Sequence, residues 1–306
     1  MTADAVKAPD RPPAAVRRTS GWLADVLVLT KARVNILVVA TTFVGFTLHV
    51  PFAHRGLLLF NTLIGTGLVA AAAAVANQIR EREFDRQMVR TRHRPLAAGR
   101  WRPGPAAGLG AILLAVGCLW LGRFVNLLAL GFAGLAFVIY VFAYTPLKRV
   151  TPVCTLVGAV AGALPVLVGW AATDTPFGGW AFIAFAVLFF WQIPHFLAIA
   201  WWRRTEYKQA GFHVLHPNDR EGFQTARRAL IFTMILLGVS FVPVILCQVS
   251  AGYGPVALAL GIGFSVFAIR FLARRNEAAA RSLFLASLFY LPTLFVLMLL
   301  GNGRHF

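Results

Sequence analysis

The sequence predicts an all-α membrane protein that spans the bilayer about nine times, and three observations lead to this prediction. Hydrophobic residues make up 58% of the 306 positions and charged residues only 13%, whereas a soluble domain carries roughly a quarter charged residues. Apolar stretches near the length of about 20 residues that one spanning helix needs follow one another along most of the chain. Lys and Arg gather in alternate connections between these stretches, which is typical of cytoplasmic loops.

The apolar stretches also define the order of the predicted elements. We expect a disordered cytoplasmic tail over residues 1–24 and one membrane domain over residues 25–306, since no segment is left for a separate soluble domain. Lys31 and Arg33 interrupt the first apolar run, which argues against a cleaved export signal. The predicted spans cover residues 34–52, 57–79, 105–122, 124–144, 153–172, 178–200, 227–249, 254–272 and 282–300.

The basic residues give this bundle an orientation. They precede the first span and follow the second, fourth, sixth and eighth, whereas the opposite connections hold little beyond Arg55, Arg123 and Arg304. Because cytoplasmic loops collect Lys and Arg, the N-terminus is predicted in the cytoplasm and the C-terminus outside. The net charge of +18 therefore reflects membrane topology, and we expect the lipid bilayer, and no nucleic acid, as a partner.

The end of the second span carries the first chemically distinctive segment. Acidic residues number only 11 in the chain, yet Glu81, Glu83 and Asp85 fall close together. If the span continues as a helix, Asn77, Glu81 and Asp85 lie on one face, one turn apart, and Glu83 points elsewhere. Two carboxylates and an amide suit Mg²⁺, which takes few protein ligands and completes its shell with waters and phosphate oxygens. This face therefore predicts a magnesium site.

Basic residues close to this face predict phosphate binding. Arg90 and Arg94 follow the acids, and Lys148 lies between the fourth and fifth spans. An Arg guanidinium offers paired donors to phosphate oxygens, so a carboxylate face beside these side chains suits a Mg²⁺-bound diphosphate. The residues alone leave a second interpretation open, in which the acids neutralise neighbouring arginines at a helix end and Lys148 anchors lipid headgroups.

A second polar segment begins inside the sixth span. Trp191, Gln192 and His195 lie there, and polar residues within a span are functional candidates because hydrocarbon disfavours them. His195 could bind a metal or a porphyrin iron, or it could simply hydrogen-bond a neighbouring helix. Arg204 and Glu206 follow at the cytoplasmic end of the span, where a solvated ion pair is the simpler interpretation of the acid.

Taken together, these segments resemble the UbiA superfamily of intramembrane prenyltransferases, and within it the branch that modifies protohaem. Asn77, Glu81 and Asp85 match the first acidic motif of that superfamily. Further matches to the protohaem branch are Leu29–Arg33, Phe84–Leu96, Tyr144–Arg149, Gly162–Trp170 and Trp191–Phe196. The second acidic motif departs from the family pattern, because Glu206 replaces the usual Asp and Ala210 stands where another acid is expected.

The resemblance implies a UbiA-type helical bundle with a central cavity open to the cytoplasmic side. Because no Arg- and Ser-rich amphipathic transit segment is evident, we expect a bacterial cytoplasmic (inner) membrane rather than a mitochondrial one. The resemblance also implies transfer of a farnesyl group from farnesyl diphosphate to a vinyl group of protohaem IX, giving haem O and diphosphate for haem–copper oxidase assembly, with a haem A synthase downstream. The implied roles are catalysis by Asn77, Glu81, Asp85 and Lys148, Mg²⁺ binding by Asn77, Glu81 and Asp85, diphosphate binding by Arg90, Arg94 and Arg204, and porphyrin binding by His195, Gln192, Trp191 and Glu206.

Two other functions stay open. A related prenyltransferase could act on a quinone precursor, chlorophyllide or another acceptor, although the segments Arg90–Pro95 and Trp191–Phe196 favour haem. A membrane transporter could carry paired polar sites in an internal repeat. However, the acids lie at the cytoplasmic end of a span rather than at the bilayer midplane, where secondary transporters bind their substrates.

Overall fold

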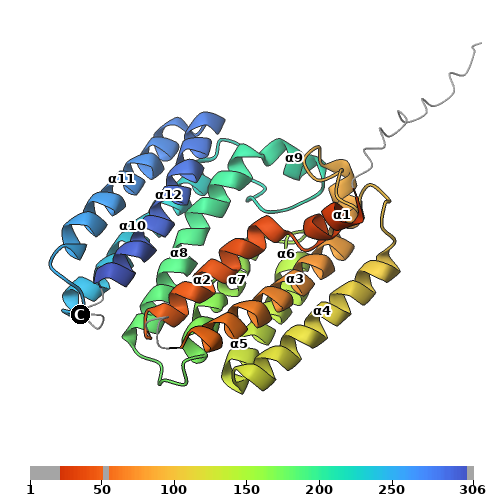
Figure 1. Ribbon diagram of the computed structural model, residues 1–306. Helices are drawn as coiled ribbons and strands as arrows, with labels where there is room; N and C mark the ends of the chain where they lie inside the picture. Colours follow the sequence, from red (N-terminus) through yellow and green to blue (C-terminus); the bar gives the residue numbers. More distant parts are fainter. Residues whose placement is uncertain (1–20, 51–54, 302–306) are drawn as a thin grey trace, which may run out of the picture.

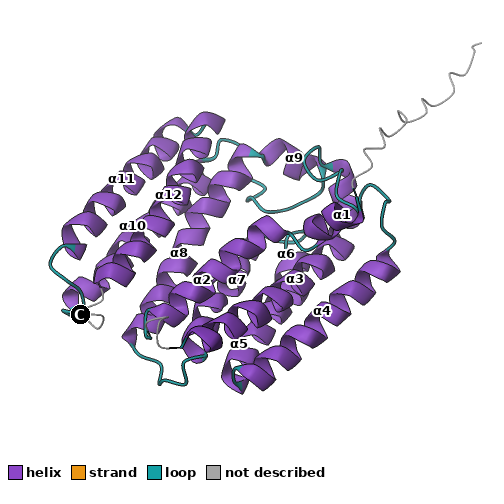
Figure 2. Cartoon of the chain, in the orientation of Figure 1, coloured by secondary structure: helices purple, strands orange, loops and turns teal. Residues whose placement is uncertain are grey.

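The computed structural model describes residues 21–50 and 55–301, and over these ranges the chain forms helices and no strand (Figure 1, Figure 2). The elements are α1 (Trp22–Leu29), α2 (Ala32–Thr47), α3 (Gly56–Gln87), α4 (Pro103–Phe124), α5 (Leu127–Val138), the π-helical η2 (Ile139–Tyr144), α6 (Thr145–Leu147), α7 (Cys154–Ala171), α8 (Gly179–Trp202), α9 (Arg204–Gln209), α10 (Phe223–Ile245), α11 (Tyr253–Arg274) and α12 (Glu277–Gly301). The predicted all-α class is confirmed. The predicted tail lies outside the described residues up to position 20, and α1 begins at Trp22.

The predicted spans correspond to these helices. Within the described ranges, eight helical segments are long and apolar enough to cross a membrane, and the fourth of the predicted spans is the continuous run of α5, η2 and α6. The first predicted span is shorter than expected, because α2 ends at Thr47 after 16 residues. Positions 51 and 52 of that span lie outside the described residues.

Helix α3 is longer than the span predicted for it. It continues without interruption from Gly56 to Gln87, and Met88 then takes an extended conformation. Its middle is rich in Ala, the strongest helix former, and the charged residues after Asn77 are also compatible with helix. The 32 residues of α3 measure about 48 Å, so the helix extends beyond a hydrocarbon core of about 30 Å.

Helices α7 and α8 lie at the centre of the bundle. Figure 1 shows α3, α4 and α5 on one side of them and α10, α11 and α12 on the other. Helix α7 packs against α2, α5 and α8, and α8 packs in turn against α10 and α12. The largest buried side chains between these helices include Trp170 of α7, Trp180 of α8 and Tyr290 of α12. Helix α7 contributes to two apolar clusters, one shared with α8, α10, α11 and α12 and the other shared with α3, α4 and α5.

Helices α2 and α7 approach each other closely because both carry glycine at the contact. A Cβ atom on Gly169 would lie 2.0 Å from the carbonyl oxygen of Thr42, and one on Gly45 would lie 1.9 Å from that of Val166. Either distance is shorter than two non-bonded atoms allow. The backbones of the two helices are thus in direct contact, which fixes the position of the helix that precedes α3.

Candidate active site

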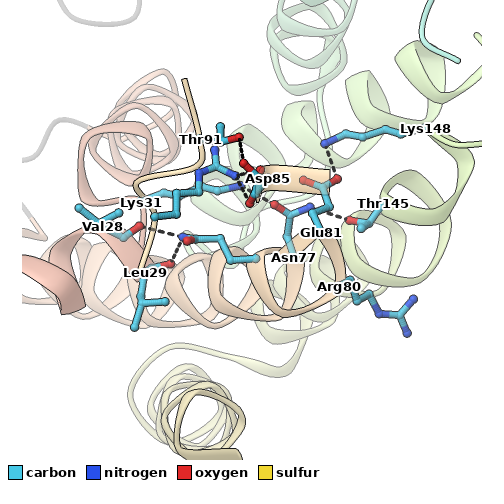
Figure 3. Close-up of polar contacts among 12 residues, drawn as sticks. Val28, Leu29, Lys31, Asn77, Arg80, Glu81, Asp85, Thr91, Thr145 and Lys148 are labelled. Carbon is cyan, nitrogen blue, oxygen red and sulfur yellow. Dashed lines mark hydrogen bonds and ion pairs between the residues drawn. The ribbon is translucent and has the colours of Figure 1, made fainter. Parts of the chain in front are cut away.

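Asn77, Glu81 and Asp85 lie on one buried face near the C-terminal end of α3. Their exposed fractions are 0%, 4% and 3%, although hydrocarbon and protein interiors both disfavour such groups unless they are paired. Figure 3 shows the three side chains on the same side of the helix, whereas Arg80 points away from them. Helix α3 continues through Asp85, as predicted. The interval of four residues therefore places the three polar groups one helical turn apart.

Each carboxylate on this face is paired with a buried or half-buried cation. Lys148, which follows α6, donates from Nζ to Oε1 of Glu81 at 2.9 Å. Arg94, from the connection between α3 and α4, donates from Nη1 to both oxygens of Asp85 at 2.9 and 2.8 Å. Thr91 of the same connection donates its hydroxyl proton to the Asp85 carbonyl oxygen at 3.1 Å. The loop is therefore folded back against the acids of its own helix.

A third cation, Lys31, binds the amide of this face. Its Nζ donates to Oδ1 of Asn77 at 2.5 Å and to the hydroxyl of Tyr140 at 3.2 Å. Lys31 stands at the break between α1 and α2, in a left-handed conformation with φ of 48°. The break turns the side chain toward α3, which lies 46 positions further along the chain.

The other half of the Asn77 amide is held by Thr145. Nδ2 of Asn77 donates to Oγ1 of Thr145 at 3.1 Å, and this hydroxyl in turn donates to the carbonyl oxygen of Tyr140 at 2.8 Å. These two bonds fix the amide with its oxygen toward Lys31. Sequence reasoning did not select Lys31, Tyr140 or Thr145 as site residues, although the matched segments Leu29–Arg33 and Tyr144–Arg149 contain two of them.

The electrostatics of the cluster favour an anion. Three cationic side chains surround two carboxylates, which leaves an excess of positive charge in a largely buried setting. Burial alone would lower the pKa of the Lys148 ammonium, but the acidic groups Tyr144 and Glu81 beside it raise that pKa well above its usual value. Lys148 is therefore charged throughout the physiological pH range, and the cluster attracts a phosphate-bearing ligand.

The segment after α9 packs against α3 and against the connection that carries Lys148. The backbone N–H of His213 donates to the carbonyl oxygen of Lys148 at 2.7 Å. The ring of Phe212 lies 5.3 Å from that of Phe84 on α3 and 5.9 Å from that of Tyr207 on α9. These contacts connect the second predicted polar segment to the first, although the two are far apart in the sequence.

Three residues predicted for the site take other positions or partners. Arg90 is exposed and makes no side-chain hydrogen bond or ion pair within residues 21–50 and 55–301. Arg204 pairs with Glu277 of α12 at 2.9 Å. Glu206 pairs with Arg203 at 3.0 Å. The structure therefore brings Arg94 and Lys148 to the acids of α3, and it does not bring Arg204 or Glu206 to them.

His195 and Trp191 form a second cluster, at the contact between α8 and α12. Nδ1 of His195 lies 2.7 Å from Oγ of Ser287, and Nε1 of Trp191 donates to the Ser287 carbonyl oxygen at 2.8 Å. The two rings are stacked with centroids 4.7 Å apart. Gln192 faces a different neighbour, because its Nε2 donates to the carbonyl oxygen of Ala159 on α7 at 3.2 Å. Of the four residues predicted to bind porphyrin, the structure therefore groups two.

Aromatic rings continue from this cluster toward the C-terminal end of α8. The ring of Phe284 lies 5.0 Å from that of His195 and 5.9 Å from that of Trp202. The guanidinium carbons of Arg203 and Arg281 lie over the Trp202 ring, at 4.2 and 5.6 Å from its centroid. We call Trp191, His195, Phe284 and Trp202 the aromatic column. One end of this column is apolar and the other carries two cations.

We call Asn77, Glu81 and Asp85, together with the cations Lys31, Arg94 and Lys148, the α3 cluster. Its chemistry suits a Mg²⁺ ion that arrives with a phosphorylated ligand. In the part of the chain that the structure describes, no three His, Cys, Asp or Glu side chains lie close enough to hold a metal by themselves. Asn77, Glu81 and Asp85 offer an amide and two carboxylates, and Mg²⁺ commonly uses one or two carboxylates, waters and substrate phosphates. Near α9, Ala210 stands one turn after Glu206, so this pair of positions offers a single carboxylate.

Comparisons of the sequence identify close relatives along nearly the whole chain. The model of the UbiA prenyltransferase family matches residues 38–294. A protein from Solibacter usitatus named protoheme IX farnesyltransferase is 38% identical, and the match covers 92% of this chain and 99% of that protein. A protein of the same name from Koribacter versatilis is 37% identical, and the match covers 95% of this chain and 97% of that protein.

Solved structures share the fold. A structure of digeranylgeranylglyceryl phosphate synthase matches with a TM-score of 0.78 at 19% identity, over 91% of this chain and 98% of that one. A UbiA homologue from Archaeoglobus fulgidus, bound to GPP and Mg²⁺, matches with a TM-score of 0.66 at 14% identity, over 90% of this chain and 99% of that one. At these identities the similarity establishes the fold alone. The substrates are inferred from the residues of the site.

Proposed function

Since this chain belongs to the UbiA prenyltransferase family, we propose that it transfers the farnesyl group of farnesyl diphosphate to a vinyl group of protohaem IX, producing haem O and diphosphate. The observation that carries the proposal is the α3 cluster, in which three cations surround the Asn77–Glu81–Asp85 face. The relatives named protoheme IX farnesyltransferase support the choice of donor and acceptor. The protein is thus a membrane-embedded enzyme.

The α3 cluster binds the diphosphate of the donor. Asn77, Glu81 and Asp85 would hold Mg²⁺, which would neutralise charge on the phosphate oxygens. Lys148, Lys31 and Arg94 add fixed positive charge at the place where negative charge develops on the leaving group, and such preorganised charge is commonly the largest catalytic contribution. Arg90 and Arg204 remain predicted contacts of the diphosphate.

The bond changes follow from this placement of charge. The allylic C–O bond breaks and its electron pair leaves with the diphosphate, so the farnesyl carbon becomes cationic. The π electrons of the haem vinyl group form the new C–C bond, and the cation passes to the vinyl carbon beside the ring. Water adds there and releases a proton to solvent. The apolar walls of the bundle exclude other water from the farnesyl cation until the C–C bond has formed.

The aromatic column is the proposed binding region for the acceptor. Its rings offer flat apolar surface to a macrocycle. Arg203 and Arg281, at its cytoplasmic end, offer donors to carboxylates such as the haem propionates. Gln192 and Glu206 remain predicted porphyrin contacts. This arrangement supports an amphipathic acceptor such as haem over a small phenolic one.

We also propose the setting of the reaction. The positive charge of alternate connections supports a bacterial cytoplasmic membrane with the N-terminus inside and the C-terminus outside. The haem O formed is then the substrate of a haem A synthase, and its final use is in haem–copper oxidases.

The test compares two carboxylates of the same helix. We expect Asp85→Ala to lower haem O formation by roughly 10²–10³-fold, the loss typical when one electrostatic contact to a leaving group is removed. Glu83→Ala is the matched control, because Glu83 is 54% exposed and pairs with Arg82 and Arg86 on the outer side of the helix end. The purified variants are incubated with haem, farnesyl diphosphate and Mg²⁺, and haem O is quantified by chromatography and mass.

Three outcomes decide the proposal. Loss of activity in Asp85→Ala alone, together with loss in wild type on chelation of Mg²⁺, supports it. Equal rates in the two variants contradict the assignment of the α3 cluster. Prenyl transfer to a quinone precursor, in place of haem, would replace the acceptor and leave the donor site intact.

A further inference from the structure

The hydrogen bonds around His195 determine which of its ring nitrogens carries the proton. Ser287 donates its hydroxyl proton to the carbonyl oxygen of Phe284 at 2.5 Å, so this oxygen has no second proton to give. The contact of 2.7 Å between Oγ of Ser287 and Nδ1 of His195 must then use a proton on Nδ1. In the neutral ring, Nε2 therefore keeps a free lone pair.

Nε2 of His195 is also accessible. It makes no hydrogen bond within the described part of the chain, and it is not among the fully covered side-chain atoms that lack a partner. The residue keeps an exposed fraction of 9%. A neutral histidine whose Nδ1–H is held by an oxygen, with Nε2 free, is the usual state of a metal ligand.

The surroundings of His195 specify the kind of metal. Among the described residues, His195 belongs to no group of three or more His, Cys, Asp or Glu side chains that could hold a metal, so the site offers one nitrogen ligand and no protein cage. Trp191 is stacked on the ring at 4.7 Å, and Phe284 lies 5.0 Å away. A single nitrogen among aromatic rings suits an iron whose other ligands come from a porphyrin.

Resting on the proposed function, we infer that Nε2 of His195 is an axial ligand of the iron of the haem acceptor. Ser287 is a positioning residue, because its bond to Nδ1 sets the tautomer and the direction of the ring. Coordination fixes the centre of the macrocycle on α8. Arg203 and Arg281 then fix its carboxylate edge. Two fixed points hold the plane in one orientation, so that one vinyl group rather than the other faces the farnesyl cation.

The experiment is haem binding by the purified full-length protein, followed by absorption and electron paramagnetic resonance. Wild type is expected to show a histidine-ligated haem. His195→Ala is expected to lose that signature, and added imidazole is expected to restore it. Ser287→Ala keeps the ligand but is expected to bind haem about 10–100-fold more weakly, as is typical when the partner of a metal-bound histidine is lost. His216→Ala, in the connection before α10, is the matched control.

Metal-free protoporphyrin IX separates ligation from packing. If His195 binds iron, wild type and His195→Ala bind the metal-free macrocycle equally, which also shows that the variant is folded. An unchanged haem spectrum in His195→Ala overturns the inference, and so does an equal loss of affinity for the metal-free macrocycle. Haem O formation by wild type in either case leaves the proposed function standing. A histidine-ligated haem in wild type without haem O formation would instead overturn the proposed function and keep the ligand.

Discussion

Asn77 is the residue of the α3 cluster whose orientation depends most on its neighbours. A carboxylate presents equivalent oxygens, but an amide presents an oxygen on one side and a nitrogen on the other. Thr145 accepts from the nitrogen at 3.1 Å, so the oxygen faces Lys31 and the proposed metal position. Loss of the threonine hydroxyl frees the amide to rotate and to present its nitrogen to a cation.

We therefore predict that Thr145→Val weakens Mg²⁺ binding by about 10–100-fold, the effect typical of a residue that orients a metal ligand. The measurement is the Mg²⁺ concentration that gives half-maximal haem O formation. Thr233→Val is the control, because Thr233 is a buried threonine of α10 whose hydroxyl donates to the Ala229 carbonyl oxygen of its own helix. An unchanged Mg²⁺ dependence in Thr145→Val would show that the amide is held by other contacts.

Residues of the site could be predicted from the sequence where spacing along one helix decides their position. Asn77, Glu81 and Asp85 were predicted as a stack because intervals of four residues fix a helix face. Lys31 and Thr145 could not be found in this way, since they reach Asn77 from positions 46 and 68 residues away. Their approach depends on a helix break and on tertiary packing. Arg204 was predicted to bind diphosphate, but it pairs with Glu277 of α12, and the sequence does not reveal that these two residues are neighbours.

Among the elements, the α2–α7 pair is the least tolerant of added volume. The carbonyl oxygen of Thr42 would lie 2.0 Å from a Cβ on Gly169, and the Phe46 nitrogen would lie 2.7 Å from it. Both atoms belong to the backbone, so no side-chain rotation relieves the clash. An added methyl group must separate the two helices.

We predict that Gly169→Ala lowers the free energy of unfolding by about 1–3 kcal/mol, the usual cost of overpacking. Gly131→Ala is the matched control, because Gly131 lies in α5 with no atom within 4 Å of the position of a new Cβ. The fraction of protein that stays monodisperse in detergent after heating measures the difference. Since Ala is the better helix former, Gly131→Ala should lose no stability, and an equal loss in the two variants would show that the close contact is not limiting.

Hydropathy predicted the helices well because each span must bury about 20 apolar residues in lipid. It did not predict where a helix changes geometry within a span. In η2, the backbone widens to a π-helix, and Thr145 thereby reaches back to the carbonyl oxygen of Tyr140, five residues earlier. The apolar residues of 139–144 give no sign of this change, since any helical geometry suits them. Such π-helical turns often accompany functional sites.

At the scale of the whole molecule, the proposed orientation places α10 and α11 with their connection outside the cell. Cys247 lies in this connection and is exposed, whereas Cys154 is buried and Cys118 is half-buried in α4. The three cysteines therefore differ in access to a water-soluble reagent. No added residue is needed to test the topology.

We predict that a membrane-impermeant maleimide labels Cys247 in spheroplasts and does not label it in inside-out vesicles. Mass analysis of the labelled peptide gives the site, and Cys247→Ser should abolish the signal. Labelling from the cytoplasmic side alone would reverse the orientation and place the α3 cluster outside.

The length of α3 has a consequence for how the reaction ends. Counted from Gly56, Asn77 lies about 32 Å along the helix, which is about the thickness of the hydrocarbon core. The acids of the α3 cluster therefore lie near the boundary between the hydrocarbon core and water. In the proposed orientation, the charged diphosphate dissolves in the cytosol, whereas the farnesylated macrocycle is retained by the lipid. The two products therefore separate into different phases, and the reverse reaction requires diphosphate and the farnesylated macrocycle to meet again at the site. Dilution of diphosphate into water thus favours the forward transfer.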